Sequence, residues 1–143
     1  MPHWVAMDLD ERAGKLCSIA LFSGLDTEAL HRIAALMTDF ECPPGQILMQ
    51  AGAAGSGLLL IEDGKVVVST RGGEIELGHG ECVGELALLD ERGQHAARVR
   101  AKTPVTGYAI DRSHFWEMLE AEPRIALSLL RVLAHRLADS IHK

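Results

Sequence analysis

Turn-forming residues recur about every eight to ten residues through the middle of the chain, and this spacing limits the folds open to it. The turn signals occur at 43–45, 52–57, 63–64, 72–73 and 78–80. The runs between them are short and suited to strands. We expect strands at 46–49, 58–62, 65–70, 74–77, 97–102 and 105–110. Many short strands at this spacing predict a closed barrel or a jelly roll.

One of these turn signals is specific enough to predict a pairing. Asp63-Gly64 separates two apolar runs. A two-residue hairpin turn needs positive φ at both central positions, which Asp-Gly supplies. We therefore expect the runs on either side of Asp63-Gly64 to form an antiparallel hairpin.

Helical periodicity precedes the strand-rich region. We expect a helix over 8–20, whose apolar residues lie near helical spacing: Leu9, Ala13, Leu16 and Ile19. Asp26 is a good N-cap for a second helix. The apolar face of that helix follows at i, i+3, i+4 and i+7: Leu30, Ile33, Ala34 and Met37.

Helices also follow the strands. Asp111 is expected to cap a helix through about Glu120, and Pro123 suits the first turn of a last helix. The last helix carries an apolar stripe: Ala126, Leu129, Leu130, Leu133 and Leu137. This stripe has two interpretations, a face buried in the core or a contact across a homodimer.

Together these elements predict a single α+β domain, mainly β, over 1–143. The fold expected is a double-stranded β-helix, or jelly-roll β-barrel, at 39–110. N-terminal helices at 1–38 and two C-terminal helices at 111–143 flank it. A short helix at 84–89 interrupts the strands.

The charge balance narrows the partners. Fourteen Lys and Arg against twenty Asp and Glu leave a net charge of −6 with the histidines neutral. Binding to nucleic acid or to an anionic membrane draws its affinity from cations, so we expect neither partner for this domain. No apolar run approaches the ~18 residues of a membrane span, and no signal peptide is evident. We expect a cytoplasmic protein.

Neither catalysis nor metal binding has a signature here. The sequence holds no nucleophile elbow and no zinc-protease motif, so we expect no catalytic residue and no enzyme activity. Cys17, Cys42 and Cys82 fit neither a disulfide framework nor a zinc spacing. We expect buried free thiols and no metal ligand.

The segment that begins at Gly84 has the design of an anion site. Gly84 allows close backbone approach at the start of the short helix. The free N–H groups of a helix start, with the positive end of its dipole, suit a phosphate. Glu85 can accept hydrogen bonds from a sugar hydroxyl. The small side chains of Ala96 and Ala97 leave main-chain N–H groups within reach of a ligand.

This segment resembles the phosphate-binding cassette of the cyclic nucleotide-binding domain family, which includes regulatory subunits of cAMP-dependent protein kinase and bacterial catabolite activators. The cassette corresponds to Gly84-Glu85-Leu86-Ala87-Leu88, a variable loop, and Ala96-Ala97. The likeness covers nearly the whole chain from about Leu21. It includes Pro44-Gly45-Gln46-Ile47-Leu48, Gly64-Lys65-Val66 and the two C-terminal helices.

The resemblance implies a set of ligand contacts. Glu85 would bind the ribose 2′-hydroxyl, and backbone groups of Gly84, Leu86 and Ala97 would contact sugar and phosphate. The last helix would close over the base. Alignment with the bacterial activators from Pro123 onward places Arg136 and Ser140 at ligand-contacting positions. The ligand residues implied are Gly84, Glu85, Leu86, Ala87, His95, Ala96, Ala97, Arg136 and Ser140.

One of these positions departs from the family pattern. His95 stands where the family has an arginine directly before the two alanines. Arginine meets a phosphate with two charged donors, whereas neutral histidine offers one. The loss costs on the order of 1.5–3 kcal/mol, or about ten- to a hundredfold in affinity. The site therefore binds cyclic nucleotide weakly, binds another ligand, or is empty.

Two consequences follow from the histidine. A protonated His95 beside a phosphate strengthens binding as the pH falls, because the ordinary pKa of histidine is about 6.5. Arg92, in the variable loop, is a candidate substitute for the missing arginine. Arg98 is not, because strand alternation with Val99 and Ala101 inward turns it outward.

The function expected is therefore a regulatory sensor that binds cAMP or a related cyclic nucleotide and relays occupancy through the C-terminal helices. The output would act on a protein partner or on a fused effector domain. The alternative is a degenerate domain of the same fold that acts as a ligand-independent interaction or dimerisation module.

Overall fold

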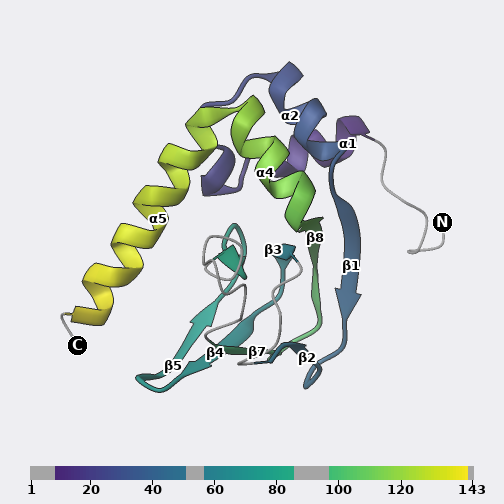
Figure 1. Ribbon diagram of the computed structural model, residues 1–143. Helices are drawn as coiled ribbons and strands as arrows, with labels where there is room; N and C mark the ends of the chain where they lie inside the picture. Colours follow the sequence, from purple (N-terminus) through teal and green to yellow (C-terminus); the bar gives the residue numbers. More distant parts are fainter. Residues whose placement is uncertain (1–8, 51–56, 86–96, 142–143) are drawn as a thin grey trace.

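The computed structural model describes residues 9–50, 57–85 and 97–141. Its strands are β1 (Thr38–Cys42), β2 (Ile47–Met49), β3 (Gly57–Asp63), β4 (Val66–Thr70), β5 (Gly73–Leu77), β6 (Cys82–Val83), β7 (Arg98–Ala101) and β8 (Val105–Asp111). They form two four-stranded antiparallel sheets, ordered β1-β8-β3-β6 and β2-β7-β4-β5 (Figure 1). The predicted jelly-roll architecture is confirmed.

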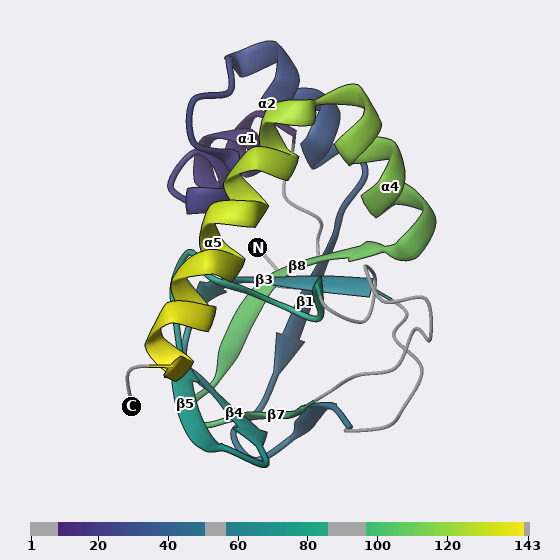
Figure 2. The same cartoon turned by 60° about the vertical axis from the view of Figure 1, so that its left-hand side comes forward.

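Helices cover one end of this β-roll. They are α1 (Leu9–Leu16), the 3-10 helix η1 (Ala20–Phe22), α2 (Thr27–Ala34), α4 (Arg112–Ala121) and α5 (Pro123–Ile141). The first four gather above the roll, and α5 starts among them and runs down alongside it (Figures 1 and 2). The last helix thus links the helical end of the molecule to the side of the roll.

The helix starts were readable from the sequence because capping is local. Asp26 accepts a hydrogen bond from the Ala29 N–H at 2.8 Å, and Asp111 accepts one from His114 at 2.9 Å. Each carboxylate satisfies a donor that the first helical turn leaves free. Both predicted N-caps are confirmed, as is Pro123 at the start of α5.

The hairpin predicted at Asp63-Gly64 is wrong. β3 pairs with β6 and β8, whereas β4 pairs with β5 and β7, so the two strands lie in different sheets. Gly64 has φ +99°, but no described residue other than glycine has positive φ, so the double positive φ of the hairpin turn is absent. The segment is instead a corner at which the chain leaves one sheet for the other.

A second corner lies against this one and explains its glycine. β7 leaves its sheet through Thr103-Pro104 toward β8. A Cβ placed on Gly64 would lie 2.2 Å from the Pro104 carbonyl oxygen. The Lys65 N–H donates to Thr103 Oγ1 at 2.9 Å, which holds the two corners together. Sheet switching here depends on a contact between segments about forty residues apart, which local turn preferences do not encode.

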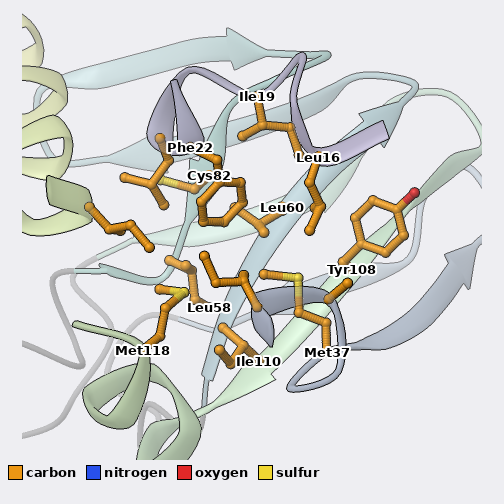
Figure 3. Close-up of a cluster of buried hydrophobic side chains, with 14 of the residues drawn as sticks. Leu16, Ile19, Phe22, Met37, Leu58, Leu60, Cys82, Tyr108, Ile110 and Met118 are labelled. Atoms are coloured by element: carbon orange, nitrogen blue, oxygen red, sulfur yellow. The ribbon is translucent and has the colours of Figure 1, made fainter. Parts of the chain in front are cut away.

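The interior has two hydrophobic clusters, one on each face of the β1-β8-β3-β6 sheet. The first lies between that sheet and the helices, and Figure 3 shows its members converging: Leu16, Ile19, Phe22, Met37, Leu58, Leu60, Cys82, Tyr108, Ile110 and Met118. The second fills the roll: Cys42, Met49, Ile61, Val66, Leu77, Val83, Val99, Ala101 and Val105. Strand alternation sends Leu58 and Leu60 to the first cluster and Ile61 to the second.

The stripe on the last helix divides between two faces. Leu129 is 3% exposed and belongs to the helix-side cluster, whereas Leu130 and Leu137 are 62% and 63% exposed. The cysteines divide as well. Cys42 and Cys82 are buried as expected, but Cys17, which directly follows α1, is exposed. Among the described helices, none is both long and apolar enough to span a bilayer.

A buried arginine joins α1 to the rest of the fold. Arg12 is 6% exposed and donates to the carbonyl oxygens of Ala34 and Met37, both at 2.9 Å. It also donates to Asp39 at 3.0 Å, and its guanidinium carbon lies 5.8 Å from the centre of the Tyr108 ring. These contacts satisfy the end of α2 and tie it to β1. Hydrophobic periodicity does not predict the burial of Arg12, because it considers only apolar residues.

Replacing Arg12 therefore tests how α1 is held. Arg12→Met keeps the length of the side chain but leaves two buried carbonyl oxygens without their donor. We expect the free energy of unfolding to fall by about 2–4 kcal/mol, measured by urea denaturation. The matched control is Lys15→Met on the same helix, whose amine lies 3.7 Å from Glu62 and whose side chain is 47% exposed. Equal effects of the two substitutions would contradict the role given to Arg12.

Candidate ligand-binding site

The site begins at Gly84, directly after β6. Gly84 has φ +97°, a conformation that side chains disfavour. A Cβ there would lie 2.7 Å from the Gly57 carbonyl oxygen and 2.7 Å from Met49 Cε. Backbone conformation and space therefore both require glycine at the point where the cassette leaves the sheet.

Glu85 follows, and its carboxylate is buried. The residue is 4% exposed, and its Oε1 accepts a hydrogen bond from Arg136 Nη1 at 2.5 Å. Arg136 Nη2 donates to the Cys82 carbonyl oxygen at 2.7 Å. A buried carboxylate needs such a partner, because its charge loses the solvation of water. Arg136 of α5 thus hydrogen-bonds to both ends of the segment from Cys82 to Glu85.

The sequence of α5 explains why Arg136 arrives there. Ile125 and Leu129 are buried at 0% and 3%, and Leu133 is packed against the same cluster. Arg136 follows three residues later on the same helical face. The face is apolar where α5 covers the core and becomes cationic where α5 passes Glu85.

The Cys82 thiol adds no second negative charge beside the pair of Glu85 and Arg136. Burial, and after it the charge of Glu85, raise the pKa of Cys82 to about 12. The thiol is therefore neutral at ordinary pH. Arg136 is left to balance the Glu85 carboxylate.

An apolar row on the inner face of the β2-β7-β4-β5 sheet starts beside Gly84. The strand register aligns Met49 with Val99, Val99 with Val68, and Val68 with Ile75. Met49 and Val99 are buried at 8% and 3%, whereas Ile75 at the sheet edge is 38% exposed. Such a row offers a flat apolar surface on which a planar ring can lie.

These residues fit two parts of a cyclic nucleotide. The Glu85 carboxylate is an acceptor for a sugar hydroxyl, and the apolar row suits a base. The phosphate requires donors from the cassette, and the cassette residues Leu86, Ala87, His95 and Ala96 lie outside the described residues. The fit is therefore to the sugar and the base.

The remaining predicted site residues are placed as follows. Ala97 is half-buried and directly precedes β7. Ser140 lies on α5, one turn after Arg136, and its side chain is outside the described residues. Arg98 is exposed while Val99 and Ala101 are 3% and 0% exposed, so its outward orientation is confirmed.

The sequence does not reveal how these residues combine. The family resemblance implies separate ligand contacts for Glu85 and Arg136, whereas the structure joins the two side chains directly. Sequence analysis did not single out Met49. A chemical argument could have predicted the pair. A buried glutamate needs a cation, and Arg136 was the helix residue already aligned to the ligand site. Among the described residues no three potential metal ligands converge.

Comparison with known proteins identifies the family of the chain. The sequence model of the cyclic nucleotide-binding domain matches residues 40–122, more than half of the chain. The chain belongs to the cyclic nucleotide-binding domain family. Cyclic nucleotide-binding domains similar to this one occur in several kinds of protein.

Three of these relatives illustrate the range. Acetyltransferase Pat of Mycolicibacterium smegmatis is 32% identical over 135 residues, which are 91% of this chain and 40% of that protein. The regulatory subunit of a cAMP-independent protein kinase A from Trypanosoma brucei superposes with a TM-score of 0.76 at 30% identity, covering 87% of this chain and 46% of that one. The catabolite activator protein of Thermus thermophilus gives 0.74 at 31%, covering 85% and 59%. The chain thus spans about half or less of two of them.

Gly84 offers a direct test of the site geometry. In Gly84→Ala the added methyl group meets a backbone oxygen and forces a disfavoured φ, so we expect the free energy of unfolding to fall by about 1–3 kcal/mol. Urea denaturation measures this loss. Gly72→Ala is the matched control. A Cβ added to Gly72 would have Thr70 Oγ1 as its nearest neighbour, at 3.7 Å, and the φ of Gly72 is not in the left-handed range. Similar stabilities for the two variants would contradict the constraint at Gly84.

Proposed function

We propose that this domain is a regulatory sensor that binds a cyclic nucleotide, cAMP first, and relays occupancy through movement of α5. The observation that carries the proposal is the bond between Glu85 and Arg136. It joins the residue assigned to the ribose with the helix assigned to the output. No other pair of described side chains connects the cassette to α5 by an ion pair.

The carboxylate can serve both roles at once. An ionised carboxylate has about four acceptor positions on its two oxygens. Arg136 Nη1 engages Oε1, and a ribose 2′-hydroxyl donating to Glu85 adds a bond without removing the arginine. A sugar at this position therefore strengthens the group that holds α5.

The relay follows from differential affinity. Ligand shifts a conformational equilibrium only as far as it binds one state better than the other. With α5 against the roll, Arg136 orients Glu85 for the sugar; with α5 displaced, the carboxylate loses that partner. Ligand binding thus favours the docked position of α5, and by linkage a partner that holds α5 away weakens ligand binding.

The phosphate contacts are part of the same proposal. Gly84, Leu86, Ala87, Ala96 and Ala97 supply the backbone of the cassette, and His95 takes the position of the family arginine. Protonation of His95 supplies the cationic donor, so affinity rises as the pH falls. Ser140 contributes a further contact from α5.

The effector is a partner protein or a fused domain. Pat carries this module within a longer chain that bears the name of an acetyltransferase, and the matched segment is 40% of it. The catabolite activator relative is likewise longer than its matched part. We propose that this domain has no catalytic residues of its own and regulates a neighbour.

Calorimetric titration tests the ligand. We expect wild-type protein to bind cAMP, with tighter binding below the ordinary histidine pKa of about 6.5 than above it. His95→Arg should bind about ten- to a hundredfold more tightly and lose the pH dependence, because the new cation does not titrate. Glu85→Gln should weaken binding by about tenfold or more, because the sugar loses a charged acceptor.

The control is cGMP, together with a Gly72→Ala variant whose change lies at a distant turn. No binding heat in wild type or His95→Arg, with an intact circular dichroism spectrum, would refute the sensor. Unchanged affinity in Glu85→Gln would refute the assignment of the ribose.

A second function is favoured by the outer face of α5. Leu127, Leu130 and Leu137 are 56%, 62% and 63% exposed. With the exposed Ala134 they lie at i, i+3, i+7 and i+10, the spacing of a coiled-coil seam. A helix apolar on two opposite faces normally has both covered. We propose that a second copy covers this face across a two-fold axis, which also suits a ligand-independent dimerisation module.

The oligomeric state distinguishes this proposal. We expect a dimer by size-exclusion chromatography with light scattering, and a monomer for the double variant Leu130→Glu and Leu137→Glu, because each charge would be buried at the seam. His135→Glu, on the exposed flank of α5, is the matched control and should stay dimeric. A wild-type monomer at high concentration would refute the dimer. Dimers that form to the same extent whether or not the protein binds cAMP in calorimetry favour the ligand-independent module.

A further inference from the structure

The outward face of the β2-β7-β4-β5 sheet has a charge pattern that neither the ligand site nor the dimer face uses. Register places Arg98, Ser69 and Glu74 in one row across three strands, and Arg100, Val67 and Glu76 in the next. Val66, Leu77, Val99 and Ala101 point into the roll. By alternation, both rows therefore point away from it.

The charges on this face are sorted by strand. We call Lys65, Arg98, Arg100 and Lys102 the basic strip. Arg98 and Arg100 alternate along β7, Lys102 directly follows that strand, and Lys65 adjoins them. The Lys102 backbone N–H donates a hydrogen bond to the Lys65 carbonyl oxygen at 2.8 Å. Glu74 and Glu76 form an acidic strip on β5, two strands and about 10 Å away. Four cations thus gather on one face of a chain whose net charge is −6.

Within the described residues, the two arginines of the basic strip are not paired with a carboxylate. Lys102 forms an ion pair with Glu76, and Glu74 accepts a hydrogen bond from Ser69 at 2.8 Å. Lys102, and more weakly Lys65, lower the pKa of Glu76, which keeps that carboxylate charged. Neither Arg98 nor Arg100 has an ion pair or side-chain hydrogen bond to any residue in the described part of the chain.

A shallow groove runs over this face. Its volume is about 450 Å³, and it is lined by Val67, Glu74, Ile75, Glu76, Arg100 and Lys102. Val67 forms its floor and is only 8% exposed although it points outward, because long charged side chains flank it. The groove therefore offers an apolar floor with cations on one wall and carboxylates on the other.

We propose that this face docks an extended acidic segment of a partner protein along the basic strip. Alternate residues of an extended chain lie about 6.6–6.8 Å apart, which matches the spacing of alternate cations along β7. Arg98 and Arg100 can each take a carboxylate with two parallel hydrogen bonds. The acidic strip sets the position of the segment, because it repels carboxylates that stray toward β5.

Two other occupants fit less well. A second copy would bring only two carboxylates to four cations, over roughly 200 Å² of sheet where a stable interface needs about 800 Å² per partner. A nucleic acid would meet the acidic strip and the overall negative charge of the chain. In the described part of the sheet face there is no aromatic side chain on which a base can stack.

Fluorescence anisotropy tests the docking face. The probe is a fluorescein-labelled peptide of alternating glutamate and serine with four glutamates, titrated with the protein in low salt and in physiological salt. We expect saturable binding that weakens with salt. Arg98→Ser and Arg100→Ser should each weaken it several-fold, and the double variant by about tenfold or more. Both side chains point outward, so the fold is retained, which circular dichroism checks.

Arg131→Ser is the matched control: it removes one exposed arginine from α5 and should leave binding unchanged. A peptide of the same composition with its glutamates in one block should bind more weakly, because the spacing is lost. No binding by wild type, or equal loss in Arg131→Ser, would overturn the proposal. So would an oligothymidylate of equal charge that binds as tightly through the same two arginines.

Discussion

The bond between Glu85 and Arg136 is the contact on which the functional reading of this structure depends. Without it, the cassette and the last helix are two separate features of the fold. With it, a buried carboxylate that follows β6 holds a helix that starts among the other helices, above the roll. Separating the pair is costly, because it would leave the buried Glu85 carboxylate without its cation.

The surrounding structure serves to present that pair. Gly84 must be glycine, so the chain turns out of β6 at one defined point and places Glu85 inside the molecule. The apolar face of α5 docks through Ile125 and Leu129, which fixes where Arg136 falls. Arg12 secures the end of α2, one of the helices among which α5 begins. The site is thus built from a strand end and a helix that are held by separate parts of the core.

The surface divides in a comparable way. One side of α5 is committed to the core and to Glu85, while the other side leaves Leu130 and Leu137 in solvent. The outward face of the β2-β7-β4-β5 sheet is polar and sorted by charge. The two proposed docking surfaces, for a second copy and for an acidic segment, thus lie on different parts of the molecule.

Local chemistry alone determined much of this protein. The caps Asp26 and Asp111, the start of α5 at Pro123 and most strands follow from short stretches of sequence, because capping and strand alternation involve near neighbours. The strands β1 and β6 escaped prediction, since one is largely polar and the other has two residues.

Only the tertiary structure decided which strands pair and which side chains meet. Asp63-Gly64 became a corner because β3 and β4 found partners in different sheets, and the fit against Pro104 is a contact distant in sequence. The burial of Arg12 and the pairing of Glu85 with Arg136 arise in the same way. A charged residue is buried only where distant groups satisfy it, and no local pattern records where those groups will be.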